Sequence, residues 1–412
     1  MTPIAFPLAT PGKNRFLGPL PLPKPFRLPK MSARSRSSRP LAPPVAGPLS
    51  VGLIGCGNIS NAYFRGVRPF AETVQIVACA DLDPARAKTK ADEHGIRMTG
   101  SVGELLGDPK IDIVLNLTVP GSHATVNLAA LKAGKHAYCE KPFSLTYQEG
   151  LSVLAEARRR RLRVGCAPDT VLGGGIQTCR KVIDDGGIGR PVAAEVNMLC
   201  PGHESWHPSP EFYYLPGGGP LFDMGPYYLT ALLTLLGPVR RVSAAARITF
   251  KERTITSQPL FGRKIRVRTP THLAGALEFA QGSIATITMS FDVWNNREAL
   301  LEVYGSEGSL SCPDPNTFGG DVSLSARPSR NWTKVALTHN DHVSRGIGLA
   351  DMAEAIRNGR PHRMSAEMAL HAVEVMEALH VSARTGRRVS IKQRFQRPAP
   401  LAPGLPLGRL DP

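Results

Sequence analysis

Two features in the first half of the chain have the residue types and spacing for chemistry: a glycine turn, Gly55-Cys-Gly57-Asn58-Ile59-Ser60, and a carboxylate, Asp81. Gly55 permits a tight turn, and the missing side chain of Gly57 lets a pyrophosphate approach the backbone. The free N–H groups of the helix that begins near Asn58 and Ile59 would hold that anion. Asp81 follows about 20 residues later and can accept hydrogen bonds from both ribose hydroxyls of an adenosine.

The carboxylate also bears on which dinucleotide is bound. It would repel a 2′-phosphate, so NAD is favoured as the cofactor over NADP, which stays open as the second choice. Alone, a Gly-x-Gly-x-x-Ser pattern is weak, because an ordinary glycine turn has the same residues, and Asp81 alone can be a turn residue at a strand end. The surrounding elements favour the dinucleotide site.

These elements alternate between strand and helix. Apolar runs predict buried parallel strands at residues 51–54, 74–80, 111–118, 135–139 and 162–167. Helices are expected at 84–94, 101–106 and 124–133, and a capping box of Thr146 and Glu149 opens a further helix that ends at Arg160. This alternation predicts a doubly wound parallel sheet with ligands at the carboxyl ends of its strands, where Gly57, Asp81, Pro120 and Lys141 all fall.

The composition is that of a globular protein with enough residues for two domains: 412 residues, 42% hydrophobic and 20% charged. No apolar run approaches ~18 residues, which argues against a membrane span. The seven cysteines stand singly and form no C-x-x-C pair. Single cysteines are typical of free thiols in a reducing, cytoplasmic compartment rather than of a disulfide framework or a zinc site.

Part of the formal charge of +17 lies in a leader, residues 1–49, which has eight Lys and Arg and no Asp or Glu. The leader is also rich in proline, so we expect it to be disordered. A basic arm can touch nucleic acid or an anionic membrane, but an unstructured leader, with Met31 as an alternative start, is the favoured interpretation. The proline-rich tail at 391–412 is expected to be loose.

Further motifs resemble a known family. Asn116-x-Thr118-x-Pro120-x-x-His123, Glu140-Lys141-Pro142 and Gly217-Gly-Gly-Pro-Leu-Phe-Asp223-Met-Gly225-Pro-Tyr227, with the glycine turn, resemble the glucose–fructose oxidoreductase, inositol dehydrogenase and MocA family over about residues 50–390. The resemblance implies an NAD(P)-binding Rossmann domain at 50–169, with Thr118, Pro120, His123, Glu140 and Lys141 near the cofactor. It also implies a substrate-binding α/β domain at 170–390, whose open, mostly antiparallel sheet often makes a homo-oligomer, either a dimer or a tetramer.

The same resemblance assigns catalysis to Lys141 and Asp223, with one departure. The family commonly has His where this chain has Tyr227, and a tyrosine, with a pKa of about 10, needs a nearby cation in order to ionise. The Lys141 ammonium can supply that charge, so Tyr227 is expected to be the acid/base, as in some sugar ketoreductases of the family. The alternative is that Tyr227 only packs or binds substrate, and that Lys141 or a water passes the proton.

The second half has longer strands and tight turns. Strands are expected at 191–199, 239–249, 272–279, 283–291 and 298–304, and helices at 173–185, 220–236, 347–358 and 364–384. Turns at Gln281-Gly282 and Glu307-Gly308 indicate hairpins and therefore an antiparallel sheet. Asp223 and Tyr227, four residues apart on the 220–236 helix, would share one face of it.

The loop before that helix carries aromatic and histidine side chains. Rings with polar heads suit sugar recognition, so the candidate substrate contacts are His203, Trp206, His207 and Tyr213. His203 and His207 also invite a metal ion. However, Pro208 and Pro210 argue against helical spacing and no third ligand is clear, so no metal is expected.

Together these features predict an NAD(P)-dependent dehydrogenase that transfers a hydride between the nicotinamide and a CH–OH group of a sugar, a sugar derivative or a cyclic polyol such as inositol. Lys141 would orient the hydroxyl and stabilise the oxyanion, and Asp223 would hold the substrate or tune its neighbours. Two other classes stay open: a non-redox glycoside hydrolase or lyase that cycles tightly held NAD, and a silent nucleotide-binding regulatory protein. The presence of both Lys141 and Asp223 argues against the silent protein.

Overall fold

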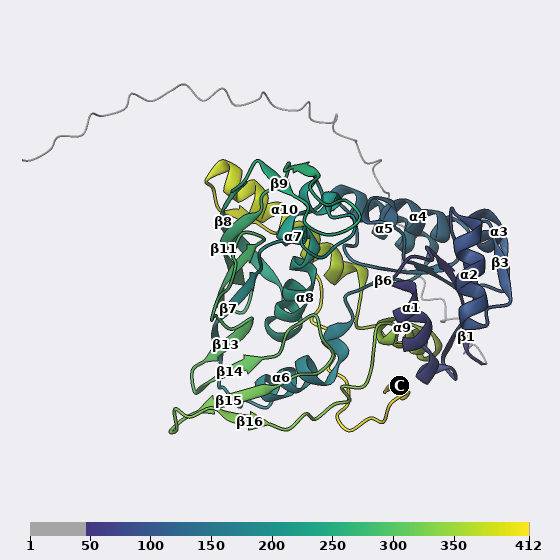
Figure 1. The fold of residues 1–412 in the computed structure, drawn as a ribbon. Coiled ribbons are helices and arrows are strands. Elements are labelled where there is room, and N and C mark those ends of the chain that lie inside the picture. The colour runs from purple at the N-terminus through teal and green to yellow at the C-terminus, as the bar shows by residue number, and fades with distance from the viewer. Residues whose placement is uncertain (1–46, 412) are drawn as a thin grey trace, which may run out of the picture. The chain divides into compact units, whose positions relative to one another are not determined.

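The first sheet contains six parallel strands in the order β3-β2-β1-β4-β5-β6 (Figure 1). It lies within residues 47–411, which are the residues that the computed structural model describes. Its strands are β1 (Leu49–Ile54), β2 (Val74–Ala80), β3 (Met98–Gly100), β4 (Ile113–Asn116), β5 (His136–Cys139) and β6 (Val164–Cys166). This order is that of a Rossmann sheet, so the predicted doubly wound parallel sheet is confirmed.

Helices cover both faces of this sheet, with α4 and α5 on one side and α1 and α9 on the other (Figure 1). The helices that connect its strands are α1 (Ser60–Gly66), α2 (Pro84–His94), α3 (Val102–Gly107), α4 (His123–Lys132) and α5 (Tyr147–Arg160). The predicted capping box at α5 is confirmed, because the Thr146 side chain accepts from the Glu149 N–H and the Glu149 side chain accepts from the Thr146 N–H.

The strand registers bring the carboxyl ends of β1, β2, β4 and β5 level with one another. Ile54 pairs with both Ala80 and Asn116, and Asn116 pairs with Cys139. The glycine turn, Asp81, the segment after Asn116 and the segment after Cys139 therefore share one edge of the sheet, where ligands of such sheets bind.

The second sheet has nine strands in the order β16-β15-β14-β13-β7-β12-β11-β8-β17. Only the pair of β7 and β12 is parallel, so the sheet is mixed but mostly antiparallel, as the resemblance implied. The strands are β7 (Pro191–Leu199), β8 (Val239–Arg247), β11 (His272–Phe279), β12 (Ile284–Ser290), β13 (Leu301–Gly305), β14 (Gly308–Cys312), β15 (Val322–Ala326), β16 (Thr333–Val335) and β17 (Val389–Ser390).

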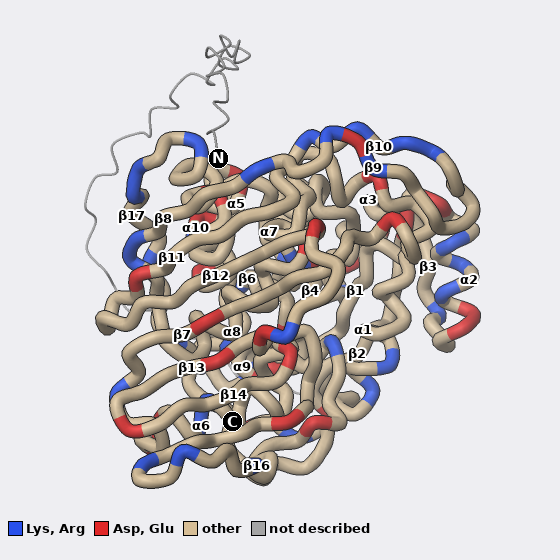
Figure 2. Tube along the Cα trace, turned by 60° about the vertical axis from the view of Figure 1, so that its left-hand side comes forward, with Lys and Arg blue, Asp and Glu red and all other residues tan. Residues whose placement is uncertain are grey.

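Helices pack on one face of the second sheet (Figure 1): α10 lies against β8, and α6 lies against β14 and β15. The helices of this half are α6 (Gly174–Asp184), α7 (Gly219–Asp223), α8 (Gly225–Leu236), α9 (Ile347–Asn358) and α10 (Ala366–Thr385). Charged residues are sparse along β11 and β12 (Figure 2). The first four residues of β12 alternate between exposed and buried, with Ile284 exposed, so the face of this part of the strand that the helices do not cover is open to solvent.

Several elements were not predicted from the sequence. The short strand β3 forms the edge of the first sheet, and a separate two-stranded ribbon joins β9 (Glu252–Thr254) to β10 (Lys264–Arg266). The strands β14, β15 and β16 extend the second sheet beyond the last predicted strand. All of these strands are at most five residues long, which leaves too little alternation to detect.

The helix predicted at 220–236 is two helices. α7 ends at Asp223 and α8 begins at Gly225, with Met224 between them. Pro226 lies in the first turn of α8 and has no N–H, so it cannot continue the hydrogen bonds of α7. Asp223 and Tyr227 therefore belong to consecutive helices instead of one helical face, and their relative position is set by the junction.

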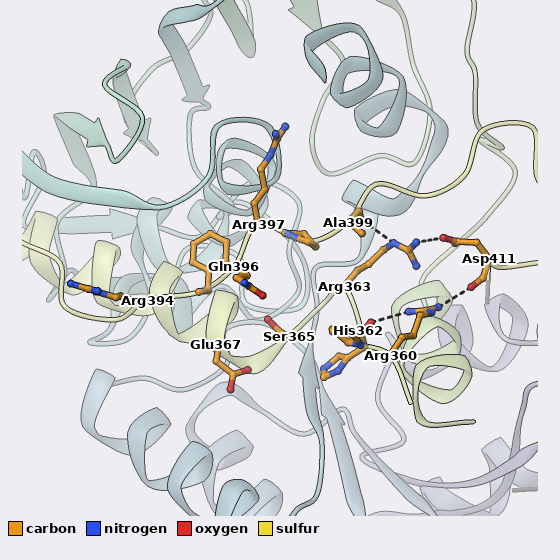
Figure 3. A pocket seen from close by; sticks show the side chains of 13 residues that line it. Arg360, His362, Arg363, Ser365, Glu367, Arg394, Gln396, Arg397, Ala399 and Asp411 are labelled. Atoms are coloured by element: carbon orange, nitrogen blue, oxygen red, sulfur yellow. Dashed lines mark hydrogen bonds and ion pairs between the residues drawn. The ribbon is translucent and has the colours of Figure 1, made fainter. Parts of the chain in front are cut away.

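The tail at 391–411 contains no helix or strand, but it is not the loose segment that its proline content predicted. Leu401 is buried and its N–H donates to Gln177 Oε1 at 2.9 Å. Arg363, in the junction between α9 and α10, donates to Ala399 O and pairs with Asp411 (Figure 3). The tail is therefore fixed against α6 and the α9–α10 junction, and beside it lies a pocket of about 1010 Å³.

Among residues 47–411, no helix is both long enough and apolar enough to cross a bilayer. All seven cysteines are free thiols, as predicted, and six of them are buried.

Candidate active site

The glycine turn after β1 has the conformation and the open space that its sequence predicted. Gly55 has a φ of +103°, and a Cβ there would lie 2.6 Å from the Leu117 carbonyl carbon, so only glycine fits. A Cβ on Gly57 would meet no atom within 4 Å. Asn58 and Ile59 follow directly before α1. The turn therefore leaves room beside its backbone for a diphosphate, which supports the predicted role of these four residues.

Asp81 lies against this turn. Its Oδ2 accepts a hydrogen bond from the Cys56 N–H at 2.7 Å, and its Oδ1 accepts one from the Asp83 N–H at 2.9 Å. Arg86 lies 3.4 Å from Oδ1. Next to the carboxylate is a pocket of about 520 Å³ between the ends of β2 and β3, lined by Asp81, Leu82, Pro84, Ala87, Thr99, Gly100, Ser101, Val102 and Gly103. This pocket and its carboxylate fit the adenosine half of a dinucleotide.

The segment after β4 is held by buried polar side chains. Asn116 Oδ1 accepts from both the N–H and the hydroxyl of Thr118, at 3.2 and 2.7 Å. His123 is fully buried, and its ring nitrogens lie 2.6 Å from Pro142 O and 2.9 Å from Thr118 O. His123 therefore links two loops at the edge of the sheet, and its predicted contact with the cofactor stays a prediction. Thr118 is half-buried and Pro120 is exposed at this edge.

Glu140 and Lys141 follow β5. The Glu140 carboxylate is nearly buried, with one oxygen accepting from the Tyr63 hydroxyl at 2.8 Å and the other from the Lys141 N–H at 2.9 Å. Glu140 thus fixes the backbone from which the Lys141 side chain extends. The Lys141 ammonium donates to Asp223 O at 2.8 Å and to Asp223 Oδ1 at 3.1 Å. The two predicted catalytic residues are therefore in direct contact, although 82 positions separate them.

Asp223 is the centre of a cluster of charged and polar groups. Lys141 contacts its Oδ1, and the His203 Nε2 lies 3.2 Å from its Oδ2. Burial raises the Asp223 pKa, but the Lys141 charge and the His203 contact outweigh burial and hold it below its usual value. Burial also lowers the Lys141 pKa, but the Asp223 charge raises it above its ordinary value. Lys141 is therefore a permanent cation near neutral pH.

Tyr227 lies beside the same ammonium. The Lys141 nitrogen is 5.0 Å from the centre of the Tyr227 ring, which is cation–π geometry. Its phenolic oxygen accepts from Arg345 Nη2 at 3.3 Å, and Arg345 also donates to Asn316 Oδ1 at 3.1 Å. Tyr227 is thus flanked by two cations. Sequence reasoning missed Arg345, which stands in a loop 118 residues further along the chain and belongs to no motif.

The aromatic loop between β7 and α7 reaches the cluster through His203, whose ring centre is 4.3 Å from that of Tyr213 and 5.2 Å from that of Trp206. The His207 ring lies 5.3 Å from both Trp206 and Tyr213. Burial raises the Tyr213 pKa to about 12, so this side chain remains a neutral phenol. All four predicted substrate residues therefore lie together. No group of three or more His, Cys, Asp or Glu within residues 47–411 is placed to hold a metal ion.

The cluster can polarise an oxygen and move a proton. An ammonium, a carboxylate, an imidazole and a phenol meet at the strand edge that carries the glycine turn and Asp81. The pocket of about 1010 Å³ shown in Figure 3 lies elsewhere: its lining residues belong to 360–367, 394–399 and Asp411 and include no predicted site residue. Pocket size is thus a poor guide to the chemistry of this chain.

Comparisons with known proteins match the two halves of the chain to models of one family. Residues 49–167 match a family model described as an oxidoreductase family with an NAD-binding Rossmann fold, and residues 176–311 match the GFO/IDH/MocA C-terminal domain. The 1,5-anhydro-D-fructose reductase of Ensifer adhaerens is 29% identical over 63% of this chain and 74% of that protein. The D-apiose dehydrogenase of Paraburkholderia graminis is 26% identical over 82% of this chain and 89% of its own length.

Two solved structures share the fold. An NAD-binding oxidoreductase from Klebsiella pneumoniae has a TM-score of 0.74 at 23% identity, and a levoglucosan dehydrogenase in complex with NADH and L-sorbose has a TM-score of 0.73 at 20% identity. Each similarity covers 84% of this chain and 99% of the other. The fold, the two matched family models and the shared strand edge lead to one assignment: the chain belongs to the GFO/IDH/MocA family of NAD-binding oxidoreductases.

Proposed function

We propose that this chain is an NAD-dependent dehydrogenase that oxidises a CH–OH group of a sugar, a sugar derivative or a cyclic polyol, with Lys141 and Tyr227 at the reacting oxygen. The observation that carries the proposal is the position of the Lys141 ammonium. It extends from the strand edge that holds the glycine turn, and Asp223 of the second half of the chain holds it in place. The names of the curated relatives, a sugar reductase and a sugar dehydrogenase, support the substrate class.

The cofactor would be held by the first sheet. Gly55, Gly57, Asn58 and Ile59 would receive its diphosphate, and Asp81 with the neighbouring pocket would receive its adenosine. Thr118, Pro120 and Glu140 would border the nicotinamide half. The bound nicotinamide supplies the hydride chemistry, so the protein has to supply position and charge.

The substrate oxygen would lie against the Lys141 ammonium, which donates a hydrogen bond to it and stabilises negative charge as the hydroxyl proton leaves. Lys141 cannot itself accept that proton, because Asp223 holds its pKa above its ordinary value. Tyr227, whose ring lies against Lys141 and whose oxygen contacts Arg345, would receive the proton as a phenolate. Asp223 and His203 would keep the ammonium aimed at the substrate, and Trp206, His207 and Tyr213 would contact the rest of the sugar.

The test is a screen of sugars and cyclic polyols with NAD and NADP, read as reduced-nicotinamide absorbance, for the wild type and for Lys141→Ala. We expect Lys141→Ala to lower turnover roughly 10²- to 10³-fold while NADH affinity, measured by fluorescence titration, stays largely intact. Lys181→Ala, an exposed lysine paired with Asp185, is the control and should keep full turnover. Unchanged turnover in Lys141→Ala would contradict the assigned role.

The same interpretation includes proposed domain bounds, a homo-oligomer and a location in the cell. The NAD-binding domain would span residues 50–169 and the substrate domain 170–390, with a homo-oligomer formed through the open face of the second sheet. Ile284 of β12, which is exposed on that face, supports this association. Seven free thiols support a reducing, cytoplasmic location.

A further inference from the structure

The rings beside the proposed catalytic cluster continue outward to the surface. His203, whose side chain is 12% exposed, contacts Asp223 and lies between the rings of Tyr213 and Phe291, at 4.3 and 4.5 Å. This inner group can surround only a substrate part that reaches Asp223. Beyond it stand two rings that the reacting group does not require, those of Trp206 and Phe212.

These outer rings are exposed and contiguous. Trp206 is 60% exposed and Phe212 is 51% exposed. His207 lies between them, with its ring centre 5.3 Å from that of Trp206 and 5.4 Å from that of Phe212. Phe212 in turn lies 4.0 Å from Tyr213, and Trp206 lies 5.2 Å from His203. Each step between rings is comparable with the width of one pyranose, so the outer group lies about one sugar ring further from Asp223.

The loop that carries these rings is held in place by contacts with Arg253 and Ser257. The Arg253 guanidinium donates to Pro201 O at 2.9 Å and to Phe291 O at 2.7 Å, and it pairs with Glu204. The Ser257 hydroxyl donates to His207 O, which ties the loop to the segment between β9 and β10. A surface that is already ordered loses little entropy on binding, so exposed rings on such a loop are well suited to receive a ligand.

We propose that Trp206, His207 and Phe212 form a second sugar-binding surface, and that the substrate is a glycoside or disaccharide whose outer group stacks there while its inner ring meets Lys141. This inference rests on the proposed dehydrogenase function and narrows its substrate. Flat rings with an imidazole between them match the alternating C–H faces and hydroxyls of a sugar. His203 contacts both Asp223 and Trp206, so this surface is continuous with the proposed catalytic cluster. We therefore assign it to the substrate rather than to a partner protein.

The experiment compares matched probes: D-glucose with cellobiose and with phenyl β-D-glucoside, and D-xylose with xylobiose. The readout is the ratio of kcat/KM for the larger probe to that for the monosaccharide. We expect this ratio to exceed ten in the wild type, and Trp206→Ala and Phe212→Ala to lower it roughly tenfold each. Trp206→Phe should keep most of it. Trp332→Ala removes a comparably exposed tryptophan beside β16, 48% exposed, and should leave the ratio unchanged.

Three distinguishable results would contradict either the second sugar-binding surface or the proposed dehydrogenase function. A wild-type kcat/KM ratio near one for every pair of probes would overturn the second sugar-binding surface, and so would a ratio that neither alanine variant changes. The proposed dehydrogenase function would be unaffected by either result. If calorimetry shows that the glycosides bind and that Trp206→Ala weakens this binding, but no NADH is formed, the sugar-binding surface is supported. The proposed dehydrogenase function is then overturned. If light scattering shows that the oligomer dissociates in Trp206→Ala while the kcat/KM ratio is unchanged, Trp206 belongs to a protein interface. This result would overturn the proposed sugar-binding surface.

Discussion

At the scale of single residues, the choice between NAD and NADP depends on Asp81 and its neighbour Arg86. The Asp81 carboxylate faces the glycine turn, and Arg86 lies 3.4 Å from it. Replacing Asp81 with alanine would remove the acceptor for the ribose hydroxyls and the repulsion of a 2′-phosphate, and it would release Arg86 to pair with that phosphate. We expect Asp81→Ala to weaken NADH binding roughly 10- to 100-fold and to strengthen NADPH binding, both measured by fluorescence titration.

The double variant Asp81→Ala with Arg86→Ala is the control. It should keep the loss of NADH affinity but lose most of the gain for NADPH, because no cation then replaces the carboxylate. An unchanged preference in Asp81→Ala would remove the assigned role from Asp81.

A second prediction at this scale concerns the proton acceptor. Tyr227→Phe keeps the ring that packs on Lys141 but removes the oxygen that meets Arg345. We expect kcat to fall roughly 10²- to 10⁴-fold with little change in NADH affinity, and the limb of the kcat/KM profile in which the rate rises with pH to disappear. His203→Asn, which acts through Asp223, should lower kcat less and keep that limb. The reverse order of losses would make His203 the proton carrier.

Single residues could be proposed from the sequence where a motif contained them. Asp81, Lys141 and Asp223 each stand in a pattern with a physical reason, and the structure brings the last two into contact. Arg345 was missed because an arginine in an irregular loop gives no pattern. His123 was assigned to the cofactor from its motif alone, and only its complete burial reveals that it links two loops.

At the scale of elements, the glycine turn between β1 and α1 allows two functions of glycine to be separated. Gly55 has a positive φ and no room for a Cβ, whereas Gly57 has open space on its Cβ side. We expect Gly55→Ala to lower the free energy of unfolding by about 1 kcal/mol or more in urea titrations without cofactor. Gly57→Ala should leave that free energy nearly unchanged but abolish NADH binding, because its methyl group would occupy the space of the diphosphate.

The two variants serve as controls for each other, since both add one methyl group to the same turn. Equal losses of stability would show that the two glycines have the same structural role. Full NADH affinity in Gly57→Ala would show that the diphosphate does not lie beside Gly57.

Helices and strands could be predicted where the regular pattern of apolar residues extends over a long segment. The strands at 74–80, 191–199 and 272–279 and the helices at 84–94 and 347–358 have the predicted bounds. The break between α7 and α8 was not predicted, although Pro226 gives a signal for it. A proline in the first turn of a helix is normal, so its presence does not reveal whether another helix ends just before it.

At the scale of the whole described chain, contacts between distant segments are what the sequence did not reveal. The tail was predicted to be loose because proline-rich composition cannot build a core, yet it is fixed by groups of α6 and of the α9–α10 junction. A second such contact is made by Asp169, which lies just after β6 and is buried. Its Oδ2 accepts from the N–H groups of Gly346 and Gly348, at 2.8 and 3.0 Å.

Asp169 thereby connects the end of the first sheet to the loop that carries Arg345. That loop also packs against Gly66 of α1, where a Cβ would collide with the Arg345 carbonyl. Burial raises the Asp169 pKa to about 6, although the two glycine N–H groups lower it. The position of Arg345, and through it the surroundings of Tyr227, thus depends on a carboxyl group that is costly to ionise.

This cost makes stability depend on pH in a defined direction. The folded pKa of about 6 lies above the unfolded value near 4, so between these pH values the folded state binds more protons than the unfolded state. As pH falls through 6 the folded state therefore gains stability from this group, and as pH rises through 6 it loses that gain, by at most about 3 kcal/mol. We expect Asp169→Asn, which cannot ionise, to remove this contribution.

The measurement is the free energy of unfolding in urea at pH 4.5 and pH 7.5, for the wild type, Asp169→Asn and Asp92→Asn. Asp92 is an exposed carboxylate paired with Lys88, so its variant removes one charge without disturbing the buried contact. Relative to the wild type, Asp169→Asn should be less destabilised, or more stable, at pH 7.5 than at pH 4.5, because only at pH 7.5 does the wild type hold a buried charge. The same difference at both pH values would show that the pKa of Asp169 is the same in the folded and unfolded states, and that its contact with the Arg345 loop is insensitive to pH.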